Sequence, residues 1–270
     1  AGAQAVGNIH AEGTTVAGAM QRELIEAIGR ADRSVVAIAI LEKTAEDRPV
    51  NIELTPDPFG GTQVRRGVSD PTDPDFIPRR YATGVILDRK GNILTANHVL
   101  GEDCRYYITT ASRQVYRAKV FAADPRSDLA VLRIDLPEAG MPSDDLRPIE
   151  LGDAAGISKG QIVVALGNPY AVARDGQASA SWGIVSNLNR KLPPIDDPSA
   201  GQGKTTLQHF GTLIQTDAKL NFGTSGGALI DLDGKMIGLT TSLAAVAGYE
   251  EAAGYAVPVD AMFRKTVELL

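Results

Sequence analysis

The sequence predicts an all-β fold, a sandwich or a barrel, with one helix near each end of the chain. Short apolar segments typical of strands recur roughly every ten residues from residue 81 onward. No helical pattern lies between these segments, which argues against a parallel α/β sheet. Segments 84–91 and 227–234 share a glycine, three apolar residues, an aspartate and a closing glycine. We therefore expect similarly built hairpins in the two halves of the chain.

The composition is that of an ordinary globular protein. The chain has 270 residues, of which 43% are hydrophobic and 22% charged, and its net charge is −6. This length suits one large domain or two barrels of about 100–150 residues each. The acidic balance argues against a nucleic-acid partner, and the longest apolar run, 35–41, is too short for a membrane span. Cys104 is the only cysteine, so the sequence predicts no intrachain disulfide.

The first 80 residues are expected to contain a helix, a strand and a long loop. Residues 14–31 have helical periodicity, and Thr14 or Thr15 can cap the helix. Residues 34–41 are apolar and β-branched, which predicts a strand. Residues 43–80 are rich in proline and charge and have no periodicity, so we expect an exposed loop. The pattern fits both a functional loop and a disordered insertion without a role.

The rest of the chain alternates strands with turns. A second loop-like segment, 189–212, interrupts them, and residues 259–270 look helical. Strands are expected at 85–87, 93–95, 106–110, 115–121, 129–134, 162–166, 181–188, 213–216, 228–232, 235–241 and 255–257.

Three short segments carry residues suited to nucleophilic catalysis. His98 follows a strand, Asp128 lies where a polar turn enters a strand, and Ser225 lies among glycines just before a strand. Each of them alone is more typical of a structural residue. Together, in the order His, Asp, Ser, they match the chain order of the chymotrypsin triad and not that of subtilisin or the α/β-hydrolases.

With these segments in place, the sequence resembles the trypsin-fold serine proteases of the HtrA/Deg type over about residues 34–260. The resemblance implies two packed six-stranded antiparallel β-barrels and a serine endopeptidase. It implies an N-terminal segment with a helix (1–33), a first barrel with the loop 43–80 (34–150), a second barrel with the loop 189–212 (151–258) and a C-terminal helix (259–270). The motifs that carry it are 84–88, 93–99, 124–132, 166–169, 214–218, 223–229 and 254–258.

The resemblance also implies a role for each catalytic residue. His98 is the general base, Asp128 orients it, and Ser225 is the nucleophile. The backbone N–H groups of Gly223 and Ser225 form the oxyanion hole. Thr224 stands where the family has asparagine, a change that leaves both amides in place.

The same mapping places the substrate. Leu220 and Leu243 form apolar walls of the pocket for the residue before the cleaved bond, which favours small aliphatic side chains. Thr241 and Ser242 lie on the edge strand that pairs with the substrate backbone. We expect no cofactor and no metal, because metal-binding histidine spacing is absent.

Biological expectations follow from the resemblance alone. It implies polypeptide partners, in particular unfolded or misfolded proteins, a periplasmic or secreted location in the cell envelope, and homotrimers built from N-terminal segments. Two alternatives stay open: a trypsin-fold module that binds peptides in a resting state, and an N-terminal helix that packs only on its own barrel. No PDZ-like segment follows Leu270, so the chain is either a protease-domain fragment or a protein without that module.

Other motifs are weaker. The segment 203–205, Gly-Lys-Thr, lacks the earlier glycine and the strand–loop–helix context of a P-loop. Cys104, His10 and His209 have no partner motif, and we interpret them as residues outside the site.

Overall fold

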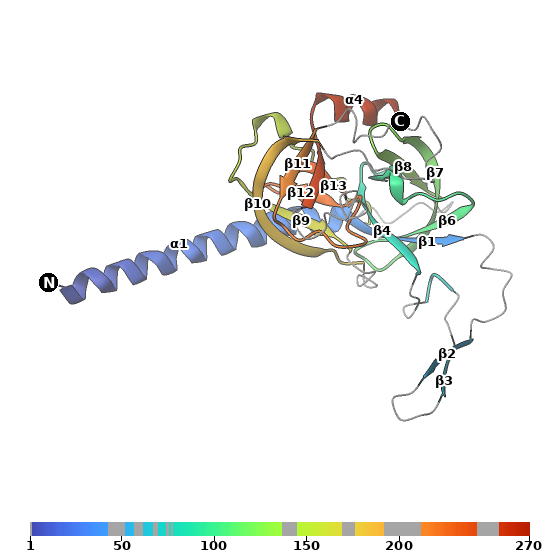
Figure 1. The fold of residues 1–270 in the computed structure, drawn as a ribbon, viewed down its shortest axis with the longest axis horizontal. Coiled ribbons are helices and arrows are strands. Elements are labelled where there is room, and N and C mark those ends of the chain that lie inside the picture. Colours follow the sequence, from blue (N-terminus) through green and yellow to red (C-terminus); the bar gives the residue numbers. More distant parts are fainter. Residues whose placement is uncertain are drawn as a thin grey trace.

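The computed structural model describes most of the chain. The described residues are 2–42, 52–56, 62–66, 70–73, 76, 78–136, 145–168, 176–191, 212–241 and 254–270. Two closed six-stranded antiparallel barrels lie side by side, with helix α1 at one end of the chain and helix α4 at the other (Figure 1). The predicted fold class is therefore confirmed.

The first barrel has the strand order β1-β4-β5-β8-β7-β6. In β1, Val36, Ile38 and Ile40 alternate with residues of the opposite face and fill the barrel, because side chains of a strand alternate between its two faces. The strands are β1 (Val35–Glu42), β4 (Arg80–Ile86), β5 (Asn92–Ala96), β6 (Cys104–Thr109), β7 (Val115–Asp124) and β8 (Leu129–Ile134).

The second barrel has the strand order β10-β11-β14-β13-β12-β9. Its interior contains Val163, Val185, Ile214 and Leu229, all buried. The strands are β9 (Ile162–Gly167), β10 (Ser179–Arg190), β11 (Leu213–Thr216), β12 (Ala228–Ile230), β13 (Met236–Thr241) and β14 (Gly254–Pro258).

A third hydrophobic cluster joins the two barrels and both helices. Leu94 and Leu129 of the first barrel pack in it with Leu166 and Leu239 of the second. Ala27 from α1 and Phe263 from α4 belong to the same cluster, along with other residues of both barrels. Full burial of a leucine side chain is worth about 1.5–3 kcal/mol, so this cluster is a main source of the adhesion between the barrels.

The two hairpins with similar sequences are built alike, as expected. Asp88 accepts hydrogen bonds from the N–H groups two and four residues later, at 2.8 and 3.2 Å. Asp231 does the same at 3.0 and 2.9 Å. Gly91 and Gly234 then adopt φ values of +84° and +76°, which glycine adopts without steric cost.

The helices differ in their bounds from the prediction. Helix α1 spans Gly2–Ala31, so Thr14 and Thr15 lie inside the helix and the predicted cap is wrong. The added turns contain several alanines, the strongest helix formers, despite three glycines. The helix extends away from the barrels, and only its C-terminal turns pack on them (Figure 1). Helix α4 spans Ala261–Leu269 and is capped by Asp260, whose carboxylate accepts from the Phe263 N–H at 2.8 Å.

The predicted loop 43–80 contains regular structure. Strands β2 (Ile52–Pro56) and β3 (Thr62–Arg66) pair as an antiparallel hairpin that projects from the first barrel (Figure 1). The prediction of a loop is therefore wrong in this part, where Ile52 and Leu54 and then Thr62 and Val64 alternate with polar residues. The second predicted loop, 189–212, is shorter at its start because β10 runs to Arg190. Within the described residues, no helix is long and apolar enough to cross a bilayer.

Candidate active site

The pairing of β5 with β8 brings His98 to Asp128. Ala96 of β5 lies opposite Leu129 of β8, so the residues just beyond these two strand ends meet. His98 lies in the 3-10 turn Asn97–Val99 that follows β5. The Asn97 N–H donates to the Asp128 carbonyl at 2.9 Å, and the His98 N–H donates to the Asp128 carboxylate at 2.8 Å. The backbone of His98 and Asn97 is thus tied to Asp128.

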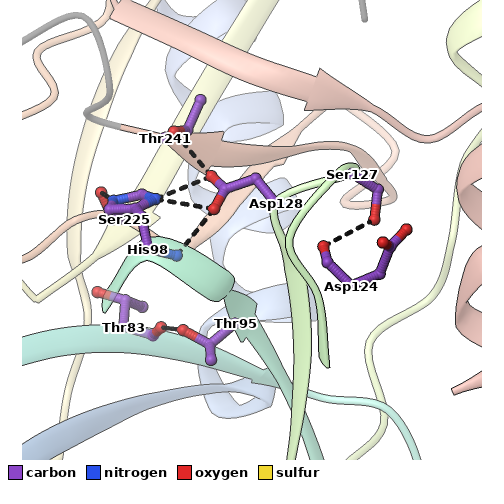
Figure 2. Close-up of polar contacts among 8 residues, drawn as sticks. All are labelled: Thr83, Thr95, His98, Asp124, Ser127, Asp128, Ser225 and Thr241. Atoms are coloured by element: carbon purple, nitrogen blue, oxygen red, sulfur yellow. Dashed lines mark hydrogen bonds and ion pairs between the residues drawn. The ribbon is translucent and has the colours of Figure 1, made fainter. Parts of the chain in front are cut away.

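Asp128 is a buried carboxylate surrounded by donors (Figure 2). Its oxygens lie 2.8 and 3.1 Å from His98 Nδ1, and the Thr241 hydroxyl donates to it at 3.4 Å. Its φ of +55° is left-handed, a conformation that aspartate tolerates better than most residues. Because its side chain is only 5% exposed and that of His98 is 23% exposed, this pair is largely shielded from water.

Ser225 approaches His98 from the second barrel. It lies in the loop between β11 and β12, is 3% exposed, and its Oγ is 3.2 Å from His98 Nε2. Gly226 has φ +85°, and a Cβ there would lie 2.2 Å from the Thr83 carbonyl oxygen. Only glycine therefore fits directly after the serine. The arrangement Asp128–His98–Ser225 can carry a proton from the serine hydroxyl to the imidazole.

The loop that carries Ser225 is fixed by backbone contacts within the second barrel. The Thr224 carbonyl accepts from the Thr240 hydroxyl at 2.5 Å and from the Gly227 N–H at 3.0 Å. The Gly226 N–H donates to the Thr240 carbonyl at 2.8 Å. In a trans peptide the N–H points opposite to the C=O, so the Ser225 N–H is directed away from Thr240.

The structure describes two of the four residues predicted to bind substrate, Leu220 and Thr241. Leu220 is half-buried, packs on the interior of the second barrel and lies against Gly254, where a Cβ would be 2.7 Å from its Cδ1. Thr241 ends β13, and its hydroxyl contacts Asp128. Ser242 and Leu243 lie outside the described residues.

Three buried threonines of the site escaped the sequence analysis in whole or in part. The sequence does not distinguish Thr83 and Thr240, which are buried, and the family resemblance assigns Thr241 only to pairing with substrate. Threonine is common in strands, so the sequence pattern offers no signal for these contacts.

The described contacts of Cys104 go to Arg80 and Glu102 and not to the triad residues. Cys104 is half-buried at the start of β6, with its Sγ 3.6 Å from Arg80 Nη1. Among the residues that the structure describes, no group of three potential metal ligands is present. His209 lies outside these residues.

Comparison with known proteins identifies the family. Residues 82–239, more than half of the chain, match the model of the trypsin-like peptidase domain. The chain belongs to the trypsin-like peptidase family. The resemblance to HtrA/Deg-type proteases is confirmed, and membership in a peptidase family agrees with the prediction of a serine endopeptidase.

Individual relatives agree with this membership. The chain is 34% identical over 184 residues to Protease Do-like 1, chloroplastic, of Arabidopsis thaliana, which covers 68% of this chain and 38% of the relative. It is 30% identical over 247 residues to a probable periplasmic serine endoprotease DegP-like of Pseudomonas fluorescens, covering 88% of this chain and 47% of the relative. The chain therefore spans less than half the length of these relatives.

Solved structures share the fold. The HtrA-type protease AlgW with decapeptide superposes with a TM-score of 0.58 at 30% sequence identity, covering 87% of this chain and 63% of that one. AlgW with tripeptide gives a TM-score of 0.57 at 27% identity, with coverages of 87% and 59%. The similarity includes both barrels, since it extends over most of the chain.

Proposed function

We propose that this trypsin-like peptidase cleaves polypeptides through an acyl-enzyme in which Ser225 is the nucleophile. His98 Nε2 accepts the proton of the Ser225 hydroxyl while Oγ attacks the substrate carbonyl carbon, and it later donates this proton to the leaving amine. Asp128 keeps the other proton on Nδ1 and stabilises the imidazolium. The observation that carries the proposal is the continuous chain of contacts at 2.8 and 3.2 Å from Asp128 Oδ2 through His98 to Ser225 Oγ.

The backbone N–H groups of Gly223 and Ser225 are proposed to bind the oxyanion. The Thr224 carbonyl is held by Thr240, which directs the Ser225 N–H away from the barrel. Gly223 has φ +94°, and a Cβ there would lie 2.5 Å from the Asn168 carbonyl oxygen and from the Tyr81 ring. Glycine is therefore required at this position, as at other sites where backbone amides must approach a ligand.

Substrate recognition is proposed to use Leu220, Thr241, Ser242 and Leu243. The half-buried Leu220 supports an apolar pocket that accepts small aliphatic side chains before the cleaved bond. The substrate backbone would add to the edge strand around Thr241, because main-chain hydrogen bonds tolerate many sequences.

The biological setting is proposed from the relatives. Unfolded or misfolded proteins are the proposed substrates, and the cell envelope, periplasmic or secreted, is the proposed location. Several relatives are named periplasmic endoproteases, and one is named chloroplastic. The projecting helix α1 supports an assembly, proposed to be a homotrimer, in which this helix has further contacts.

Labelling with a fluorophosphonate probe tests the nucleophile directly. The wild-type chain should be labelled once and should cleave casein, and the Ser225→Ala variant should do neither. A folded wild-type sample that stays unlabelled at several temperatures would contradict the proposal. If the same sample bound peptide, a resting peptide-binding module would replace it.

A further inference from the structure

Thr83 connects the first barrel to the loop that carries the nucleophile. It lies on β4, is fully buried, and pairs with Ala37 of β1 along one edge of the strand. On the other side its N–H donates to the Ser225 carbonyl at 3.0 Å. Its hydroxyl donates to the Gly223 carbonyl at 2.6 Å and accepts from the Asn168 N–H at 2.8 Å. Thr83 therefore contacts three points of the second barrel.

The two carbonyls that Thr83 binds belong to Gly223 and Ser225, the residues whose amides are proposed for the oxyanion hole. Both carbonyls are fixed on the side of the loop that faces β4. The short segment between them contains Thr224, whose own N–H donates to the Asn221 carbonyl at 3.1 Å. Since each peptide unit is planar, anchoring these carbonyls restricts the rotation of the peptide planes around Ser225.

Thr83 is itself held by the strand that leads to the base. The Thr95 hydroxyl donates to the Thr83 carbonyl at 2.7 Å (Figure 2). Thr95 is fully buried in β5, which ends two residues before His98. The hairpin β4–β5 thus positions the base through its chain and the nucleophile loop through Thr83. This links the two halves of the site at a fixed distance.

We infer that Thr83 is a positioning residue whose hydroxyl holds the Gly223–Ser225 segment in the conformation that stabilises the oxyanion. The inference rests on the proposed function and adds a residue that touches neither the substrate nor the reacting atoms. Valine has almost the shape of threonine but can neither accept from Asn168 nor donate to Gly223. Small misplacement of catalytic groups costs on the order of 10²-fold in rate, so Thr83→Val should lower kcat by about 10–100-fold.

The experiment compares Thr83→Val with two matched variants. Thr83→Ser keeps the hydroxyl and should retain kcat within about threefold. Thr216→Val removes an equally buried hydroxyl that accepts from the Ala218 N–H at 3.1 Å and donates to the Ile184 carbonyl at 2.8 Å. It should lower the melting temperature to a similar extent without the loss of kcat. The KM of Thr83→Val should stay near that of wild type, because the oxyanion forms only in the transition state.

A second measurement does not require turnover. Hydrogen exchange of peptides spanning residues 221–227 should be faster in Thr83→Val than in wild type, Thr83→Ser or Thr216→Val. Should Thr83→Val fail to fold, Thr83→Ala and Thr83→Ser make the same comparison. The inference is overturned if kcat is preserved in Thr83→Val, if exchange of this segment is unchanged, or if no hydroxyl-free variant folds. An unlabelled, inactive wild type would contradict the proposed function, and the exchange result would still decide the role of Thr83.

Discussion

Replacing Asp128 by asparagine tests the role of the buried carboxylate with little change in shape. Two N–H groups of His98 and the Thr241 hydroxyl face the carboxylate oxygens. Asparagine has one acceptor oxygen and one NH₂ donor. If its oxygen keeps the bond to the His98 backbone N–H at 2.8 Å, its NH₂ faces Nδ1.

The size of the effect follows from the tautomer of the imidazole. An NH₂ group that faces Nδ1 makes this nitrogen an acceptor, so the proton moves to Nε2 and the nitrogen 3.2 Å from Ser225 Oγ can no longer accept. We expect kcat to fall by about 10⁴-fold, which corresponds to about 5.4 kcal/mol of activation free energy. The backbone bonds to Asp128 remain, so the fold should be retained.

The assay is the kcat of wild type and variant on a fluorogenic peptide, with circular dichroism to show that both are folded. Asp124→Asn is the matched control, because Asp124 ends β7 just before the same turn and its described partners, Arg126 and Ser127, lie within that turn. It should keep kcat near the wild-type value. A folded Asp128→Asn variant with kcat within tenfold of wild type would refute this assignment of the proton to Nδ1.

Three further predictions concern stability. Gly226→Ala places a Cβ 2.2 Å from the Thr83 carbonyl oxygen at φ +85°. The free energy of unfolding, measured with denaturant, should fall by at least about 1–3 kcal/mol, and fluorophosphonate labelling should slow. Wild-type values in both assays would contradict the steric argument. Asp260→Ala removes the cap of α4 and should lower the free energy of unfolding by about 1 kcal/mol in the same assay, with kcat unchanged. An unchanged unfolding midpoint would show that the cap does not stabilise the fold. The pKa of Asp124 lies below its ordinary value. Burial raises this pKa, but hydrogen bonds from Ser127 and Arg126 together lower it by more. The charged Asp124 carboxylate therefore stabilises the fold above the pKa it has in the unfolded chain, and this stabilisation is lost as the pH falls through its pKa in the folded chain. The difference in melting temperature between wild type and Asp124→Asn should shrink below about pH 5. An unperturbed carboxylate would leave this difference unchanged.

The strands were largely predictable because many of them show short apolar segments or an alternation of apolar and polar side chains. The predicted bounds of 129–134 and 213–216 match the structure to the residue. The first is a mostly apolar run that follows a polar turn, and the second begins with Leu213 and Ile214 after a glycine-containing segment. The start of α1 was missed because alanines and glycines carry no amphipathic signal. The hairpin β2–β3 was missed because the prolines and glycines around it resemble a loop.

The site was predictable only where its residues lie in recognisable motifs. His98, Asp128 and Ser225 each stand in such a motif, and the structure brings all three within hydrogen-bond distance in series. Thr83 and Thr240 act through contacts between distant parts of the chain. Their hydroxyl groups bind backbone groups, which leave no trace in the sequence.

The division of the site between the barrels bears on when the protein becomes active during folding. His98 and Asp128 belong to the first barrel, and Ser225 belongs to the second. A chain in which only one barrel has folded has either a base without a nucleophile or a nucleophile without a base. On the proposed mechanism, the catalytic site is therefore complete only after the barrels dock through the shared cluster that includes Leu94 and Leu239. On this mechanism, a nascent or partly unfolded copy lacks the complete triad and does not cleave its neighbours.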